Sequence, residues 1–181
     1  GSTIVPQLLA DLGFSNLSVV EEQADGDSDF STVESPNPEE RSAFELALEL
    51  AEEKEAEVIM ATDPDCDRMA PAVRDADGNY QFLNGNETGV LFADYLLRSK
   101  KESGNLGDNG VIIKSIVSTD MVSEIAEDYG VEVLDVLTGF KFIGEKITEF
   151  EKTGEKEFIL GFEESLGYLI GKHARDKDAA V

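Results

Sequence analysis

The sequence predicts an α/β protein made of two consecutive three-layer α/β/α units with mixed, mainly parallel sheets. Short apolar stretches alternate with longer segments in which apolar residues recur every three or four positions. This alternation is typical of strands joined by helical crossovers. A turn at residues 75–79, rich in Asp, Gly and Asn, separates the two halves. We therefore expect one unit at residues 1–77 and the other at residues 78–181.

The expected helices and strands follow the apolar pattern along the chain. Helices are predicted at residues 3–12, 38 to about 51, 87–100, 119–130 and 142–152, and strands at residues 17–20, 58–61, 111–117, 131–137 and 158–162, with a short strand on each side of the turn at 75–79. The second helix has a clear start, because Asn37, Pro38 and Glu40 match a capping box. The chain opens on a helix with no strand before it, so we expect the central part of a longer α/β polypeptide.

Composition narrows the class of protein. The chain carries 39 acidic and 15 basic side chains, a formal net charge of −24 that would repel nucleic acid. No apolar run approaches the roughly 18 residues of a membrane helix, and no stretch resembles a signal peptide. One Cys and one His exclude a disulfide framework and a zinc site of the usual Cys/His type. We expect a cytoplasmic protein with no nucleic-acid partner and no membrane partner.

Three aspartates alternate directly after a predicted strand, in the stretch "ATDPDCDRMA". Asp63, Asp65 and Asp67 would point the same way in an extended chain, so they could converge on one cation. Oxygen-only ligands favour a hard ion, Mg²⁺ or Ca²⁺. A calcium-binding EF-hand would need Gly and Glu where this chain has Arg68 and Arg74, so Mg²⁺ is the better interpretation. An acidic surface turn whose aspartates cap backbone amides remains the alternative.

Arg68 follows the third aspartate at once. A guanidinium offers a planar fork of donors for a phosphate that a metal ion also contacts. The sequence therefore predicts a divalent cation among the carboxylates and a phosphoryl group beside Arg68.

Polar residues also follow predicted strands in the second half of the chain. The stretch "LTGFKFIGEK" supplies Thr138, Gly139 and Lys141. Its glycine spacing is not that of a P-loop, and an ordinary strand-to-helix connection is the alternative. The stretch "GFEESLGY" places Glu163 and Ser165 between glycines, where they could hydrogen bond to sugar hydroxyls.

Basic residues gather near the end of this acidic chain, in "GKHARDKDAA". Lys172, His173, Arg175 and Lys177 lie within six positions. They could form an anion site, or they could be a solvated terminus.

Together these stretches resemble the α-D-phosphohexomutase superfamily, the phosphoglucomutases and phosphomannomutases. "TDPDCDR" resembles the family's magnesium loop, with Cys66 where small residues such as Ala or Gly are usual, and "GFEESLGY" resembles its sugar-recognition loop. "ESPNPEE", "TGFKFIG" and "RDKD" resemble further segments of the family, and the motifs occur in the family's order. The resemblance implies that residues 1–77 and 78–181 are the second and third of four domains arranged around a cleft.

The resemblance also implies roles for individual residues. Asp63, Asp65 and Asp67 would hold one Mg²⁺ per active site, with a phosphoserine oxygen from the first domain as a further ligand. Arg68 would be catalytic, in contact with the phosphoserine or the transferring phosphate. The other implied roles are proton transfer at the attacking hydroxyl for Lys177, and substrate binding for Thr138, Gly139, Lys141, Glu163, Ser165 and Arg175.

The activity that the resemblance implies is interconversion of a hexose 1-phosphate and a hexose 6-phosphate. A phosphosugar would be the substrate, and a hexose 1,6-bisphosphate would be the activator and intermediate. The family's Thr-Ala-Ser-His-Asn-Pro type loop is not in the sequence, whose only histidine, His173, follows Lys172. We therefore expect the chain to be inactive by itself and to need the family's first and fourth domains as partners.

Other functions remain open at this point. Within the family, the chain could belong to a phosphopentomutase or a phosphoglucosamine mutase. Outside it, a magnesium-dependent phosphatase could use Asp65 or Asp67 as nucleophile. A non-catalytic acidic binding module is a third alternative.

Overall fold

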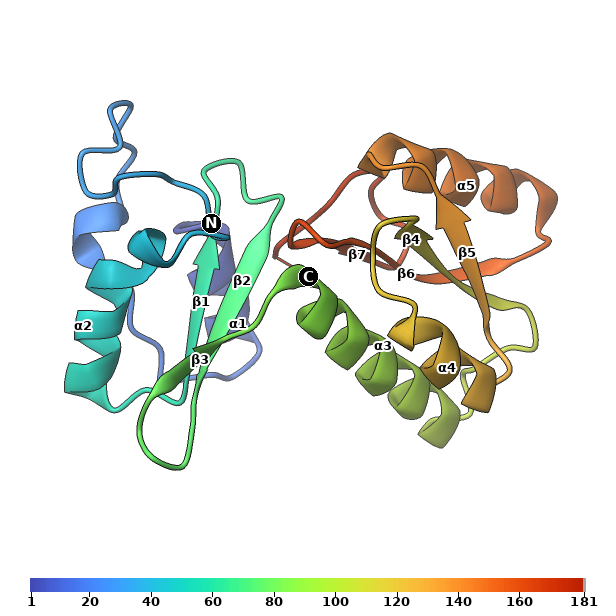
Figure 1. Ribbon diagram of the computed structural model, residues 1–181, viewed down its shortest axis with the longest axis horizontal. Coiled ribbons are helices and arrows are strands. Elements are labelled where there is room, and N and C mark those ends of the chain that lie inside the picture. The colour runs from blue at the N-terminus through green and yellow to red at the C-terminus, as the bar shows by residue number, and fades with distance from the viewer. Residues whose placement is uncertain (181) are drawn as a thin grey trace. The chain divides into compact units, whose positions relative to one another are not determined.

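In the computed structural model, which describes residues 1–180, the chain divides into two compact units, Gly1–Leu83 and Asn84–Ala179 (Figure 1). Each unit has its own sheet and its own buried apolar side chains. The first unit runs past the boundary expected at residue 77, because strand β3, Tyr80–Phe82, pairs with β2, Met69–Arg74.

The sheet of the first unit has the strand order β1-β2-β3 and is antiparallel throughout, with β1 covering Val58–Thr62. The connections at residues 63–68 and 75–79 explain these directions, because parallel neighbours need a crossover of about a dozen residues or more. The predicted α/β class is confirmed, but the mainly parallel arrangement holds only in the second unit.

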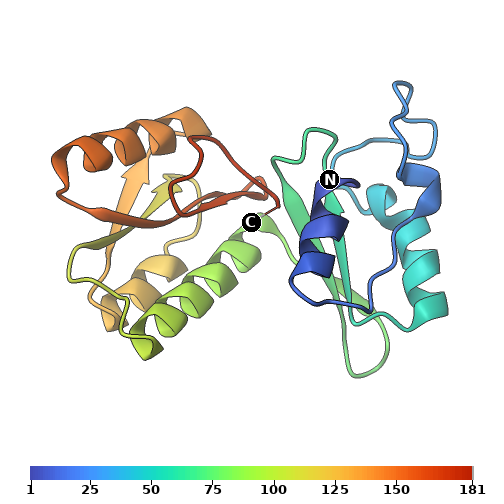
Figure 2. The same cartoon turned by 180° about the vertical axis from the view of Figure 1, so that it is seen from behind.

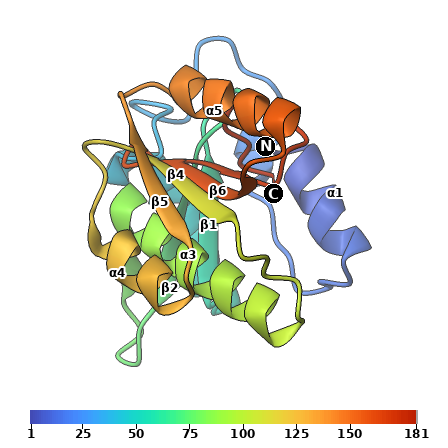
Figure 3. The ribbon, with the colours of Figure 1, turned by 90° about the vertical axis from the view of Figure 1, so that its right-hand side faces the viewer.

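The first of the two helices of this unit lies behind β1 and β2 in Figure 1, in front of them in Figure 2 and to one side of them in Figure 3, and the second contacts β1. Helix α1, Ile4–Asp11, buries none of its residues. Helix α2, Glu45–Lys54, continues from a 3-10 turn, η2, at Arg41–Phe44; another 3-10 turn, η1, covers Glu21–Gln23. Phe44 at the end of η2 is buried, so it links this helix to the core of the unit.

One face of the first sheet keeps exposed apolar side chains. Val58, Met60 and Val73 are exposed, whereas Ile59 and Ala72 on the opposite face are buried. Successive residues of a strand point to opposite faces, so only one side of this sheet contributes to a core.

Two expectations for the first unit are wrong. Residues 17–20 form no strand, and the helix expected from residue 38 begins later, with η2 and α2. The Asn37 side chain accepts from the Glu39 backbone N–H at 3.2 Å and from Arg68 Nη1 at 3.4 Å. It therefore stabilises a local turn and meets the aspartate loop, and it caps no helix.

The second unit has a mainly parallel sheet with the strand order β5-β4-β6-β7. Strand β4 runs parallel to β5 and β6, and β7 runs antiparallel to β6. The sequence pattern did not predict β7, a four-residue strand that is too short for a periodic signal. The elements are α3 (Gly85–Glu102), β4 (Gly110–Ser115), α4 (Met121–Asp128), β5 (Glu132–Val136), α5 (Phe140–Thr153), β6 (Glu157–Glu163) and β7 (Gly167–Ile170).

Helices cover both faces of the second sheet, with α5 on one face and α3 and α4 on the other (Figure 1). Val111 and Ile113 of β4 pack in one cluster with Ile143 and Ile147 of α5. Helix α3 begins at Gly85, two residues before the expected start, and has a capping box at Asn84. No helix within residues 1–180 is both long enough and apolar enough to cross a membrane.

Candidate functional site

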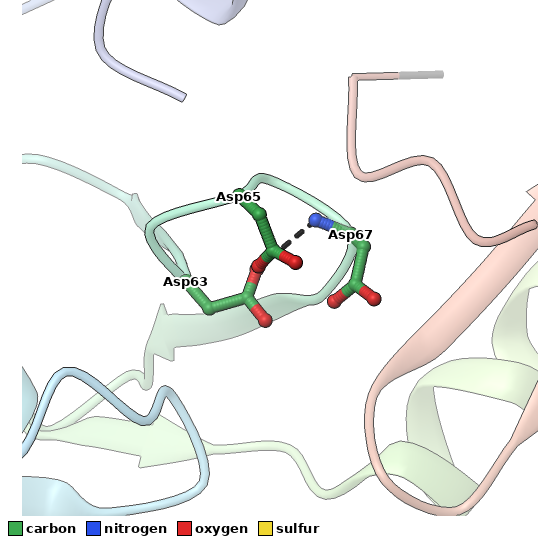
Figure 4. A group of neighbouring side chains, drawn as sticks. All are labelled: Asp63, Asp65 and Asp67. Carbon is green, nitrogen blue, oxygen red and sulfur yellow. Dashed lines mark hydrogen bonds between the residues drawn. The ribbon is translucent and has the colours of Figure 1, made fainter.

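An acidic loop at the carboxyl end of β1 forms the first cluster. Asp63, Asp65 and Asp67 each offer one carboxylate oxygen, and these three atoms lie within 4.8 Å of one another (Figure 4). The loop is a turn: the Cys66 N–H donates to the Asp63 carbonyl at 3.0 Å, and Cys66 has a φ of +59°. The carboxylates thus converge as the sequence suggested, but through a turn and not through extended chain.

Asp63 is the buried member of the group, with 4% of its surface exposed. Its Oδ1 accepts from the backbone N–H groups of Asp67 and Arg68, both at 3.0 Å, and its Oδ2 accepts from Arg68 Nε at 2.8 Å. Burial raises the pKa of Asp63, but these hydrogen bonds and the Arg68 charge outweigh burial and hold the pKa below its usual value. Asp63 is therefore ionised at neutral pH.

Arg68 binds carboxylates from two parts of the first unit. Hydrogen bonding to Asp63 is the main reason that the pKa of Arg68 is raised. Its Nη1 lies 3.4 Å from Asn37 Oδ1 and 3.6 Å from a carboxylate oxygen of Glu39, so the "ESPNPEE" segment reaches the aspartate loop. Its Nη2 has no hydrogen-bond partner within residues 1–180. One edge of the guanidinium is thus available for a further acceptor.

The aspartate group fits a hard divalent cation. An ionised carboxylate has about four lone-pair positions, and Asp63 uses three of them in the hydrogen bonds just described. One position on Oδ2 stays available, while Asp65 is exposed and Asp67 is half-buried. Three oxygen ligands on one side suit Mg²⁺, which usually keeps further positions for water or a phosphate oxygen.

Strand ends of the second unit form the other cluster. Because β4, β5 and β6 are parallel, the residues that follow them meet at one edge of the sheet. Glu163, the last residue of β6 and 5% exposed, accepts from the Gly139 N–H at 2.7 Å. Gly139 has a φ of +117°, which side chains rarely tolerate. This bond joins two of the stretches for which the resemblance implied substrate binding.

Lys177 lies at the same edge. A Cβ on Gly167 would be 2.1 Å from Lys177 Cδ, so the lysine stem crosses the start of β7 where only glycine leaves room. Its Nζ is 5.7 Å from the ring centroid of Phe140, the residue after Gly139. The chain thus returns this lysine to the neighbourhood of Glu163.

The other residues expected to bind substrate are Thr138, Ser165, Lys141 and Arg175. Thr138 is exposed beside Gly139, Ser165 is half-buried two residues after Glu163, and Lys141 is exposed. Lys141 and Arg175 line a shallow pocket of about 390 Å³ along α5.

Arg175 is used within the second unit. Its Nε donates to Thr148 Oγ1 at 3.1 Å, its Nη1 donates to the carbonyls of Lys172 and Ala174, and its Nη2 pairs with Glu151. These contacts attach the segment that carries Lys177 to helix α5.

Sequence reasoning missed a group of polar residues at the end of β4. Lys114, Ser115 and Ser118 are buried there, and Glu164 reaches the two serines. The available signal was position, because Lys114 and Ser115 end a buried parallel strand and Ser118 follows it.

The fold and the two clusters define an α/β protein with a candidate divalent-cation loop in one unit and a strand-edge group of polar side chains in the next. Family models match both units: "Phosphoglucomutase/phosphomannomutase, alpha/beta/alpha domain II" at residues 1–78 and "domain III" of the same family at residues 84–181. The chain belongs to the phosphoglucomutase/phosphomannomutase family.

Relatives of known name agree with this family. The chain is 44% identical over 179 residues to a phosphoglucomutase of Staphylococcus haemolyticus, covering 99% of this chain and 32% of the relative. It is 41% identical over 175 residues to a phosphomannomutase of Mycoplasmoides pirum, covering 97% of this chain and 31% of that one. The crystal structure of a putative phosphomannomutase from Thermus thermophilus matches 81% of this chain and 30% of its own, at 25% identity and a TM-score of 0.60. The chain therefore spans about a third of the length of these relatives.

Proposed function

We propose that this chain supplies the magnesium-binding and sugar-recognition parts of a phosphohexomutase, which interconverts hexose 1-phosphates and hexose 6-phosphates. The observation that carries the proposal is the convergence of three aspartate oxygens within 4.8 Å beside Arg68. The names of the relatives, phosphoglucomutase and phosphomannomutase, support the reaction class.

In this proposal Asp63, Asp65 and Asp67 hold the cation. Bound Mg²⁺ would supply charge neutralisation for a phosphoryl group during its transfer. Arg68 keeps Asp63 ionised and oriented through its Nε, and its Nη2 edge donates to a phosphoryl oxygen. The arginine thus both fixes the loop and binds the transferring group.

The strand edge of the second unit binds the sugar. The Gly139 N–H donates to Oε1 of Glu163. The other oxygen of this carboxylate, Oε2, is left to accept from a sugar hydroxyl. Ser165 and Thr138 offer hydroxyl groups, and Lys141 and Arg175 add positive charge. Lys177, close to Phe140 and Gly167, is in place to assist proton transfer at the attacking hydroxyl.

Mutase turnover requires a phosphorylation loop that this chain lacks. Its sequence contains no Ser-His phosphorylation loop. We infer that mutase turnover requires a serine from another domain, that a hexose 1,6-bisphosphate is the intermediate, and that the chain by itself is inactive. A cytoplasmic location fits this chemistry, because sugar phosphates are metabolites of that compartment.

A magnesium titration of the 181-residue chain, followed by amide NMR shifts and calorimetry, tests the site. We expect shifts at residues 63–67 and an affinity of about 10⁻⁴ M or weaker, since few ligands come from the protein. Asp65→Asn should lower the affinity about tenfold or more, whereas Asp25→Asn, at an exposed position outside the loop, should leave it unchanged. No response at residues 63–67, or sub-micromolar affinity, contradicts the proposal.

A phosphatase assay separates the main rival function. If Asp65 or Asp67 were a nucleophile, this chain would hydrolyse a generic phosphate ester in the presence of Mg²⁺. We expect no such hydrolysis.

A further inference from the structure

A carboxylate and two hydroxyls join the turn after β6 to the end of β4. Glu164 Oε2 accepts from Ser115 Oγ at 2.7 Å and from Ser118 Oγ at 3.1 Å, and the two hydroxyl oxygens are themselves 2.7 Å apart. Ser115 and Ser118 are 0% and 4% exposed. The two hydroxyls together supply two protons, and the Glu164 carboxylate can accept both. If the carboxylate is removed, one hydroxyl can still donate to the other, but at least one of the two protons then has no acceptor in the group.

The turn that carries Ser118 is fixed independently of Glu164. Lys114 Nζ, whose side chain is 1% exposed, donates to the Ser118 carbonyl at 3.1 Å. The same ammonium pairs with Asp120 at 3.0 Å and with Asp135 of β5 at 2.8 Å. The serine pair is therefore a rigid anchor, and Glu164 is the group attached to it.

The turn after β6 is tightly constrained in return. Glu163 and Glu164 leave it in different directions, one to Gly139 and the other to the serine pair. Leu166 has a φ of +66°, and a Cβ on Gly85 would lie 2.0 Å from the Glu164 carbonyl oxygen. Because this turn is held on both sides, it keeps Glu163 and Ser165 in one arrangement.

We propose that Glu164 is a positioning residue for sugar recognition. By binding Ser115 and Ser118 it fixes the turn that presents Glu163 and Ser165 to a hexose phosphate, without touching the ligand itself. The ligand in this inference rests on the proposed function, whereas the anchoring is a property of the second unit alone.

Three variants of the 181-residue chain test the role. Glu164→Ala removes the acceptor, Glu164→Gln keeps an acceptor oxygen, and the double variant Ser115→Ala/Ser118→Ala removes the anchor. Glu102→Ala, at the exposed end of α3, is the matched control. Each is measured for amide hydrogen exchange at residues 163–167, for the urea midpoint of the second unit, and for affinity towards D-glucose 1-phosphate by NMR titration.

We expect Glu164→Ala and the double serine variant to speed exchange at residues 163–167 about tenfold or more, and to weaken glucose 1-phosphate binding to a similar degree. Combining Glu164→Ala with the two serine substitutions should add little, because both changes remove one interaction. Glu164→Gln should stay within about twofold of the unaltered chain, as should the control. Should Glu164→Ala unfold the unit, Ser118→Ala gives a milder form of the same comparison.

Several outcomes overturn the proposal. Unchanged exchange in Glu164→Ala shows that the turn needs no anchor. Faster exchange with unchanged ligand affinity shows that the anchor does not serve recognition. Loss of binding in Glu164→Gln together with full binding in the double serine variant shows direct ligand contact. If the unaltered chain binds no glucose 1-phosphate, the proposed function fails, and exchange still decides whether Glu164 anchors the turn.

Discussion

Arg68 and the aspartates beside it show, at the scale of single residues, why like charges can gather in one loop. The guanidinium contacts Asp63 at 2.8 Å and lies 3.7 Å from Asp67, so it offsets part of the repulsion in the folded chain. The same positive charge repels a Mg²⁺ ion at the aspartates, so it should lower their Mg²⁺ affinity. Stability and metal affinity are therefore expected to respond to Arg68 in opposite directions.

Arg68→Gln should lower the free energy of unfolding of the first unit by about 1–3 kcal/mol, because it leaves the buried Asp63 carboxylate without its charged partner. It should also raise Mg²⁺ affinity, and saturating Mg²⁺ should restore part of the lost stability. Urea unfolding with and without Mg²⁺ measures both effects, with Arg98→Gln on α3 as the control. Unchanged stability, or weaker Mg²⁺ binding, would contradict this account.

Cys66 is strained by its place in the aspartate turn. Its φ of +59° lies in the left-handed region, where a side chain costs about 1–2 kcal/mol. Cys66→Gly should therefore leave the first unit as stable or slightly more stable, whereas β-branched Cys66→Val should lower its free energy of unfolding by about 1–2 kcal/mol. Ser18→Val, at an exposed position of ordinary φ, is the control in thermal unfolding. Equal stability of the Gly and Val variants would show that this turn carries no strain.

At the scale of elements, helix α3 approaches β6 closely because of one glycine. A Cβ on Gly89 would lie 2.5 Å from a ring carbon of the buried Phe162. Gly89→Ala should destabilise the second unit by about 1–3 kcal/mol, even though Ala is the better helix former. Urea unfolding of Gly89→Ala against Glu102→Ala on the same helix measures this. A gain in stability would mean that intrinsic helix propensity outweighs the packing.

Lys114 ties strand β4 to its neighbours and makes the second unit sensitive to high pH. Burial lowers the pKa of Lys114, but hydrogen bonds to Asp135 and Asp120 outweigh burial and raise it above the usual value. A lysine with a raised pKa holds its proton more tightly when folded. Its contribution to stability is thus fully present below the unfolded pKa of about 10.4 and is lost as pH rises through the folded pKa.

The stability advantage of the unaltered chain over Lys114→Met should therefore be larger at pH 8 than above about pH 11. Urea unfolding of the second unit at both pH values checks this, with the exposed Lys152→Met as control. An advantage that grows with pH would show that the sign is wrong.

At the scale of the whole molecule, the two units have unequal cores. Among the described residues, the buried apolar side chains of the first unit are Phe44, Ala51, Ile59, Ala70 and Ala72. The second unit buries a cluster of eight around β4 and α5 alone. Burial of apolar area is the main stabilising term, so the second unit should be the more stable one.

We expect two unfolding transitions in urea, with the amide signals of residues 1–83 lost first. Residues 84–181 expressed alone should keep the upper transition, because their sheet and helices are complete within that range. Gly89→Ala should shift only the upper transition. A single concerted transition for all amides would contradict this expectation.

The sequence by itself determined the α/β class, most helices and strands, and the location of the aspartate loop. Apolar periodicity is a local property, so the helices near residues 3–12, 87–100 and 142–152 could be predicted, as could strands β4, β5 and β6 of the second sheet. The three aspartates could be found because their spacing is local as well. Lone short elements such as β7 carry too few residues for such a signal.

Only the tertiary structure decided how distant groups are paired. Asn37 meets Arg68 across 31 positions of the chain, and Glu164 meets Ser115 across 49, so no spacing rule could join them. Strand direction in the first sheet likewise depended on which neighbours pair. Buried polar groups must find partners wherever the folded backbone brings a donor and an acceptor together, and that choice is made by packing over the whole unit.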